Sequence, residues 1–255
     1  GRTVYHDQKK EIDLRQLDHS AMKPVRKKLQ IVFQDPHSSL NPAFTVFGSL
    51  QDLLKTFGIK SRTEIRKKIG DLLEAVNMRR EQMDHYPHEF SGGQRQRIGI
   101  GRALCVEPEL IVCDEAVSAL DVSIQAQVLK LLKDIKDKRG LTYIFITHDL
   151  SVVEYISDRV AVMYLGKIVE IGSTEEIFTT PSHPYTQSLM KAVPRLEAKR
   201  RERSAVLKGD VPSALDVPTG CRFHPRCQFR LKKCAQEDPR LSEVKHSHWS
   251  ACFLN

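Results

Sequence analysis

Three short runs of mainly apolar residues constrain the fold of this chain more than any other feature. They cover residues 29–33, 110–113 and 143–146, and their apolar residues do not alternate with polar ones. Such runs are typical of strands buried on both faces of a parallel sheet. Each run leads into polar residues that are suited to chemistry: Gln34, the pair Asp114 and Glu115, and His148. Because the carboxyl ends of parallel strands meet at one edge, we expect these side chains to share one site.

The segments between and after these strands predict the rest of the architecture. Residues 46–77 are rich in helix formers and predict a helical region inserted into the sheet domain. Residues 159–164 and 167–172 flank Leu165-Gly166 and predict a β-hairpin that closes the sheet. Prolines become frequent from residue 181 onward. We therefore predict two domains, 1–180 and 181–255.

Composition limits the classes of function. The chain has 255 residues, 40% of them hydrophobic and 28% charged, which suits an α/β domain with an appendage. Its apolar runs, such as 160–165, fall short of the about 18 residues that a membrane span needs, and no signal-peptide pattern is present. We therefore expect a cytosolic protein that reaches a membrane only through partners.

Net charge does not indicate a nucleic-acid partner. The formal charge is +8, and basic residues gather between 195 and 203. Glu197 and Glu202 interrupt that cluster, and no aromatic residue is interleaved for base stacking. We expect a solvated helix or linker there.

A glycine pair marks the start of a predicted helix over residues 94–106. Gly92 and Gly93 let a phosphate approach the backbone closely, and the helix dipole favours negative charge at this end. Ser91 is a natural N-cap. By itself, Ser91-Gly92-Gly93-Gln94 also fits an ordinary cap of a surface helix. Together with Asp114-Glu115, it favours nucleotide hydrolysis.

These motifs resemble the ATPase subunits of ABC transporters, and the resemblance runs from about Leu29 to Cys252. It implies a P-loop NTPase fold of the α/β class, with a parallel-sheet core and an inserted helical subdomain. In that family the signature motif contacts ATP held by the opposing subunit, so the working unit is a dimer. The signature residues here are Ser91, Gly92, Gly93 and Gln94.

The same resemblance implies roles for the strand-end residues. Asp114 holds Mg²⁺, Glu115 is the general base, and Gln34 contacts both the metal and the water. His148 bridges the γ-phosphate and Glu115. Asp121 is the last residue of Ser118-Ala119-Leu120-Asp121, which matches the D-loop that communicates between the two sites across the dimer. The resemblance places Asp121 among the nucleotide-binding residues.

One expected motif is missing from this sequence. G-x-x-x-x-G-K-[ST], the Walker A loop that holds the phosphates, does not occur. We interpret the chain as N-terminally truncated, with the segment before Gly1 lost or not recorded; a naturally degenerate subunit is the alternative. Alone, the chain is expected to be inactive as an ATPase.

The C-terminal segment carries four of the six cysteines: Cys221, Cys227, Cys234 and Cys252. Residues 183–189 and 193–195 before them resemble the extension of oligopeptide and dipeptide importer ATPases. In a cytosolic protein, metal ligation is favoured over disulfides. The resemblance implies a 4Fe–4S cluster; Zn²⁺ and unliganded thiols are the alternatives.

The remaining cysteines and the nearby histidines are given structural interpretations. We interpret Cys105 and Cys113 as small buried hydrophobic residues. His224, His246 and His248 are interpreted as loop residues, because four cysteines already complete a tetrahedral set.

The resemblance implies ATP-driven uptake of oligopeptides or dipeptides. The implied partners are a second ABC ATPase in a homo- or heterodimer, two membrane permease subunits and an extracytoplasmic peptide-binding protein. The implied place is peripheral, at the cytoplasmic face of the membrane. Importers of nickel or glutathione are the alternative, as is a catalytically impaired binding module.

Overall fold

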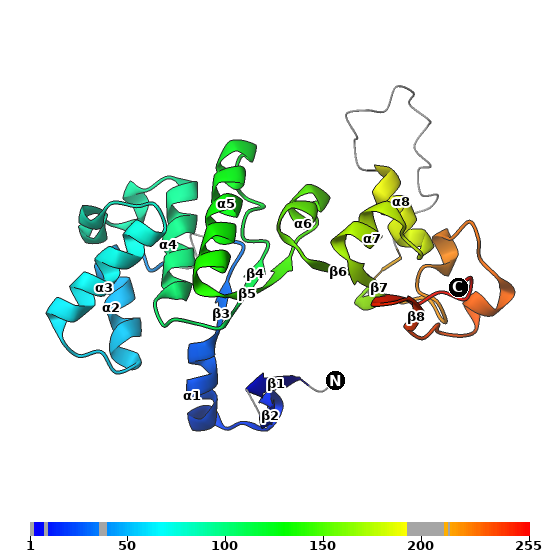
Figure 1. The fold of residues 1–255 in the computed structure, drawn as a ribbon, viewed down its shortest axis with the longest axis horizontal. Coiled ribbons are helices and arrows are strands. Elements are labelled where there is room, and N and C mark those ends of the chain that lie inside the picture. Colours follow the sequence, from blue (N-terminus) through cyan, green and yellow to red (C-terminus); the bar gives the residue numbers. More distant parts are fainter. Residues whose placement is uncertain (1–2, 8–9, 36–39, 193–211, 214) are drawn as a thin grey trace. The chain divides into compact units, whose positions relative to one another are not determined.

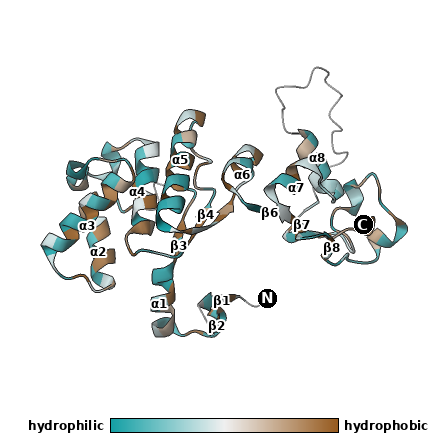
Figure 2. Cartoon of the chain, viewed as in Figure 1, coloured by the Kyte–Doolittle hydropathy of each residue, from teal (hydrophilic) through white to brown (hydrophobic). Residues whose placement is uncertain are grey.

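Three parallel strands form the sheet that the apolar runs predict. The computed structural model describes residues 3–7, 10–35, 40–192, 212–213 and 215–255 (Figure 1). The strands pair side by side in the order β3 (Leu29–Val32), β4 (Leu110–Asp114) and β5 (Thr142–Ile146). They run parallel, and Ile31, Val112 and Ile144 form one row across them. Hydrophobic residues lie along all three strands (Figure 2), and the parallel arrangement is confirmed.

The prediction that these strands are buried on both faces is wrong. One face carries Ile111 and Cys113, which are fully buried. On the other face Ile144 and Ile146 are 50% and 49% exposed. Successive side chains of a strand point to opposite faces, and helix α4 (Gly92–Leu104) packs against β3. The apolar run therefore indicated the strand correctly but not its burial.

The helical region predicted over residues 46–77 is confirmed as a helix pair. Helix α2 (Val46–Thr56) is capped by the Thr45 hydroxyl, and α3 (Arg62–Ala75) by the Ser61 hydroxyl. Their buried faces carry large apolar side chains that leave almost no surface to solvent: Leu50, Leu54, Ile65, Ile69 and Leu73. Two 3₁₀ turns then lead into α4: η2 (Arg80–Asp84) and η3 (Pro87–Glu89).

The other elements of the first compact unit, residues 1–149, flank this core in the sequence. A β-hairpin and two helical elements precede β3: β1 (Val4–Asp7), β2 (Lys10–Asp13), η1 (Leu14–Gln16) and α1 (His19–Lys28). Helix α5 (Val122–Arg139) joins β4 to β5 and ends at Gly140, whose φ of 63° is the left-handed conformation that favours glycine.

The second compact unit, residues 150–255, contains an antiparallel sheet of its own. The predicted hairpin is present as β6 (Arg159–Tyr164) and β7 (Lys167–Ser173). It does not close the parallel sheet, which corrects the prediction. The free edge of β7 pairs instead with β9 (His248–Ser250), which pairs with β8 (Ser242–Lys245). The unit's helical elements are α6 (Leu150–Ile156), α7 (Thr174–Thr179), α8 (Pro184–Ala192), η4 (His224–Arg226) and η5 (Lys232–Ala235).

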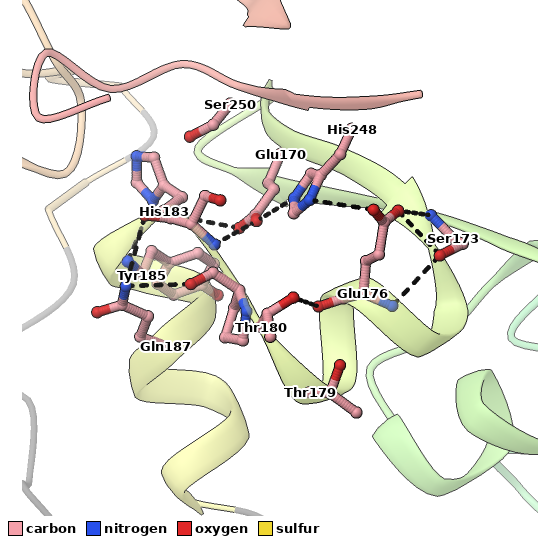
Figure 3. A network of polar contacts seen from close by, with 12 residues as sticks. Glu170, Ser173, Glu176, Thr179, Thr180, His183, Tyr185, Gln187, His248 and Ser250 are labelled. Carbon is pink, nitrogen blue, oxygen red and sulfur yellow. Dashed lines mark hydrogen bonds and ion pairs between the residues drawn. The ribbon is translucent and has the colours of Figure 1, made fainter. Parts of the chain in front are cut away.

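A buried polar network joins distant parts of this second unit (Figure 3). Glu170 of β7 and His248 of β9 are both 0% exposed, and His248 Nε2 lies 2.7 Å from Glu170 Oε1. The same carboxylate accepts hydrogen bonds from the backbone N–H groups of Ser182 (2.6 Å) and His183 (3.0 Å). His248 is therefore a core residue of a strand, and its interpretation as a loop residue is wrong.

Three sequence predictions relate to the chain's organisation. The predicted boundary at residue 180 falls between α7 and α8, inside the second unit, and as a functional boundary it stays a prediction. The basic cluster at 195–203, which the sequence assigned to a solvated helix or linker, lies outside the described residues. Among the described helices, none combines the length and hydropathy needed to traverse a bilayer.

Candidate active site

The polar residues that follow the three parallel strands do converge. Gln34 lies two residues beyond β3, Glu115 directly follows β4, and His148 lies two residues beyond β5. Gln34 Nε2 donates a hydrogen bond to Glu115 Oε2 at 2.6 Å. His148 Nδ1 lies 3.1 Å from Glu115 Oε1. One carboxylate is thus held between an amide and an imidazole.

This carboxylate is accessible and oriented, as a general base must be. The Glu115 side chain is 28% exposed, and the His148 side chain is 74% exposed. A base acts only on a proton within hydrogen-bond reach, so solvent access and fixed direction are both needed. The amide nitrogen of Gln34 donates to Glu115, so the amide oxygen of Gln34 does not take part in this contact.

Asp114 is half-buried at the last position of β4. Carboxylate and amide oxygens are the ligands that Mg²⁺ takes, so Asp114 and the Oε1 of Gln34 fit that ion by donor type. Among the described residues, no group of three or more His, Cys, Asp or Glu side chains is arranged to hold a metal ion by itself. The magnesium roles of these two residues stay predictions.

The glycine pair begins α4, as predicted, behind a reciprocal cap. The Ser91 hydroxyl accepts from Gln94 N at 3.3 Å, and Gln94 Oε1 accepts from Ser91 N at 2.9 Å. Gly93 is required by packing, because a Cβ there would lie 2.4 Å from Cγ2 of Ile124. The helix start is therefore pressed against the first turn of α5.

A polar cavity of about 570 Å³ opens beside this helix start. Its walls include Ser91, Gly93, Gln94 and Arg97, and Arg97 also donates to Gln127 Oε1 of α5 at 2.8 Å. A pocket of this size at a helix N-terminus, with a guanidinium in its wall, suits a phosphorylated ligand. The sequence reasoning had not identified Arg97, although the basic residue one turn after the glycines was a usable signal.

Asp121 has a structural role in this chain. Its carboxylate accepts from Ile124 N at 2.9 Å and so caps α5. A contact between Asp121 and a nucleotide stays a prediction.

The four C-terminal cysteines come together around one small cavity. Cys221, Cys227, Cys234 and Cys252 line it, and its volume of about 10 Å³ has room for about one water molecule. Burial is the main cause that raises the pKa of the Cys221, Cys227 and Cys252 thiols, and neighbouring thiols add to it. The resemblance to peptide-importer ATPases predicted that these four residues form one site, and they do line one cavity.

Cys105 and Cys113 lie in the core of the first unit, where burial raises the pKa of each thiol to about 12. Their interpretation as small buried hydrophobic residues is confirmed.

The comparison with known proteins agrees with this geometry. Residues 2–118 match the family described as ABC transporter, and residues 169–234 match the one described as oligopeptide/dipeptide transporter, C-terminal region. A putative peptide import ATP-binding protein of Brucella ovis is 47% identical over 241 residues, which cover 94% of this chain and 76% of that protein. The chain belongs to the ABC transporter ATPases.

Other relatives of this ABC ATPase carry similar names. The dipeptide transport ATP-binding protein DppF of Haemophilus influenzae is 49% identical, with 89% of this chain and 70% of that protein covered. The oligopeptide transport ATP-binding protein AppF of Bacillus subtilis is 49% identical, with 91% and 71% covered. The predicted resemblance to the oligopeptide/dipeptide branch is confirmed.

A solved structure shares the fold of this ABC ATPase. It is cbiO1 from Clostridium perfringens, part of the ABC transporter complex cbiONQ, with a TM-score of 0.58 and 28% identity. The match covers 64% of this chain and 64% of that one. The predicted ABC ATPase fold is confirmed at this level.

Proposed function

We propose that this chain is the ATP-hydrolysing subunit of an importer for oligopeptides or dipeptides. The observation that carries the proposal is the Glu115 carboxylate, held by Gln34 and His148 at the shared edge of three parallel strands. The peptide names of the relatives support the choice of cargo.

The proposed chemistry follows from what these side chains are able to do. A water oxygen attacks the γ-phosphorus of ATP, the bond to the bridging oxygen breaks, and ADP leaves as the water's proton passes to Glu115. His148 and Gln34 keep the carboxylate directed at that water. Asp114 and Gln34 would hold Mg²⁺, which when bound neutralises charge on the transferring phosphoryl group.

The signature residues act on a nucleotide held by a second ATPase. Ser91, Gly92, Gly93 and Gln94 present a helix N-terminus beside a polar cavity, where backbone N–H groups favour a phosphate. The proposed assembly therefore contains two ATPase subunits, two permease subunits and an extracytoplasmic peptide-binding protein. In it this chain lies peripherally on the cytoplasmic face and binds no nucleic acid.

Transport by the assembled complex tests the proposed cargo. We expect proteoliposomes that contain the transporter, expressed from its complete genes, to take up labelled dipeptides or oligopeptides only when ATP is supplied on the ATPase side. Vesicles loaded with ADP are the control. Uptake of nickel or glutathione with no uptake of peptide would refute the cargo, and no ATP-dependent uptake at all would refute the importer role.

We further propose that the four C-terminal cysteines bind a 4Fe–4S cluster, with Zn²⁺ as the alternative. Thiolate donors suit both groups. Because burial raises the pKa of three of these thiols, metal binding must displace their protons. Among the described residues no such side chains are arranged as a ready metal-binding group, so the four thiols must rearrange to seat a cluster.

Metal analysis of Cys227→Ser tests the cysteine site. Protein purified without oxygen is expected to be brown, with about four irons and matching sulfide per chain, and the variant is expected to lose most of both. Cys105→Ala, a change at a buried cysteine of the other unit, should keep the full content. Colourless protein with stoichiometric zinc would refute the iron–sulfur cluster in favour of Zn²⁺. Wild-type protein without any metal would refute both and show that the four cysteines are unliganded thiols.

A further inference from the structure

The backbone of Glu115 has an unusual conformation for a residue of its type. Its φ is +46°, in the left-handed region that non-glycine residues rarely occupy. Strain of this kind persists only where neighbouring groups hold it, and it often gathers at functional sites. Neighbouring groups must therefore hold the Glu115 backbone in this conformation.

Both backbone groups of Glu115, the N–H and the carbonyl, are hydrogen-bonded. On one side Glu115 N donates to Ile146 O at 2.9 Å, which continues the pairing of β4 with β5. On the other side Glu115 O accepts two hydrogen bonds from one residue, Ser118: from its N–H at 3.1 Å and from its hydroxyl at 2.9 Å. Ser118 thus closes the turn that begins at Glu115.

Within this turn, Ser118 is the residue whose side chain hydrogen-bonds the Glu115 carbonyl. Ala116 and Val117 are each 2% exposed and have apolar side chains, so they anchor the turn to the core but cannot donate from a side chain. Ser118 is exposed, so its hydroxyl does not fill space in the core. Removing that hydroxyl should loosen the Glu115 carbonyl without opening a cavity.

We propose that Ser118 is a positioning residue for Glu115. By bonding the carbonyl of a left-handed residue, Ser118 fixes the direction in which the carboxylate leaves the backbone, and so keeps it within reach of both Gln34 and His148. The inference rests on the proposed function of Glu115 as the base. Ser118 acts through Glu115 and touches no reacting atom.

Steady-state ATP hydrolysis by the assembled transporter tests this role. Ser118→Ala is expected to lower kcat about fivefold, in line with the loss of one hydrogen bond, while KM for ATP stays unchanged. Ser118→Thr keeps a hydroxyl at the same position and should restore most of kcat. Ser118→Cys, with a weaker donor of similar size, should fall between them.

A matched serine controls for general destabilisation. Ser61 is an exposed serine of the same unit whose hydroxyl caps α3, so Ser61→Ala also removes a hydrogen bond of a serine hydroxyl, far along the chain from Glu115. It should lower the melting temperature at least as much as Ser118→Ala does and leave kcat unchanged.

The outcomes separate this inference from the function on which it rests. If Glu115→Gln abolishes turnover but Ser118→Ala matches the wild type, the positioning role is refuted and the base remains. A rise in KM with unchanged kcat, or failure of threonine to rescue, also refutes it. If Glu115→Gln itself retains turnover, the proposed base and its positioning residue are both refuted.

Discussion

Replacing Glu115 with glutamine is expected to lower ATP turnover by the assembled transporter about a hundredfold or more, since a positioned general base contributes roughly that much. Glutamine keeps the size of the side chain, and its carbonyl can still accept from Gln34 Nε2, the bond that the carboxylate accepts at 2.6 Å. It cannot take a proton from water. Phosphate release at saturating ATP measures the effect.

A neutral change of another acid shows whether the loss is specific. Glu81 is an exposed glutamate of η2, so Glu81→Gln removes the same charge outside the strand-end site and should leave turnover unchanged. Binding of ATP by the Glu115→Gln complex should persist, because the missing group acts in the chemical step. Turnover above about a tenth of the wild-type rate would mean that another group serves as the base.

Local signals in the sequence were enough to predict much of the first unit. The apolar runs gave the three parallel strands, and Ser91 with the two glycines gave the start of α4. Each is a short-range pattern whose physical cause lies within a few residues. The convergence of Gln34, Glu115 and His148 then followed from the geometry of parallel strands alone.

Features that depend on distant residues were not predictable in this way. The edge partner of β7 is β9, and the two pair Glu170 with Ser250, residues far apart in the sequence. An antiparallel hairpin looks the same in sequence whichever sheet it joins, so the pattern could not exclude the parallel one. The left-handed backbone conformation of Glu115 was also not predictable, because the residue there is not a glycine or asparagine, the types that usually adopt it.

Burial of the network around Glu170 leads to the largest expected effect on stability. Glu170→Ala should lower the free energy of unfolding of the second unit by about 3–5 kcal/mol, because buried donors lose their acceptor and His248 its partner. Those donors are the N–H group of Ser182 and, as Figure 3 shows, the N–H group of His183 and the His248 ring. Glu170→Gln should also destabilise the second unit. The one amide oxygen of glutamine cannot accept from all of these donors, and its NH₂ group adds two further donors to the buried site.

The chain's one tryptophan makes this effect measurable in the second unit. Trp249 lies next to His248 on β9 and pairs with Ile171 of β7, so its fluorescence during urea unfolding reports the sheet that Glu170 holds together. Glu243→Ala is the matched control: Glu243 is exposed on β8 and accepts from Ser247 N at 2.9 Å, and its loss should cost less than about 1 kcal/mol. Equal urea midpoints for Glu170→Ala and Glu243→Ala would show that the buried carboxylate does not hold β7 to β9. Glu170 would then stabilise the unit no more than the exposed Glu243 does.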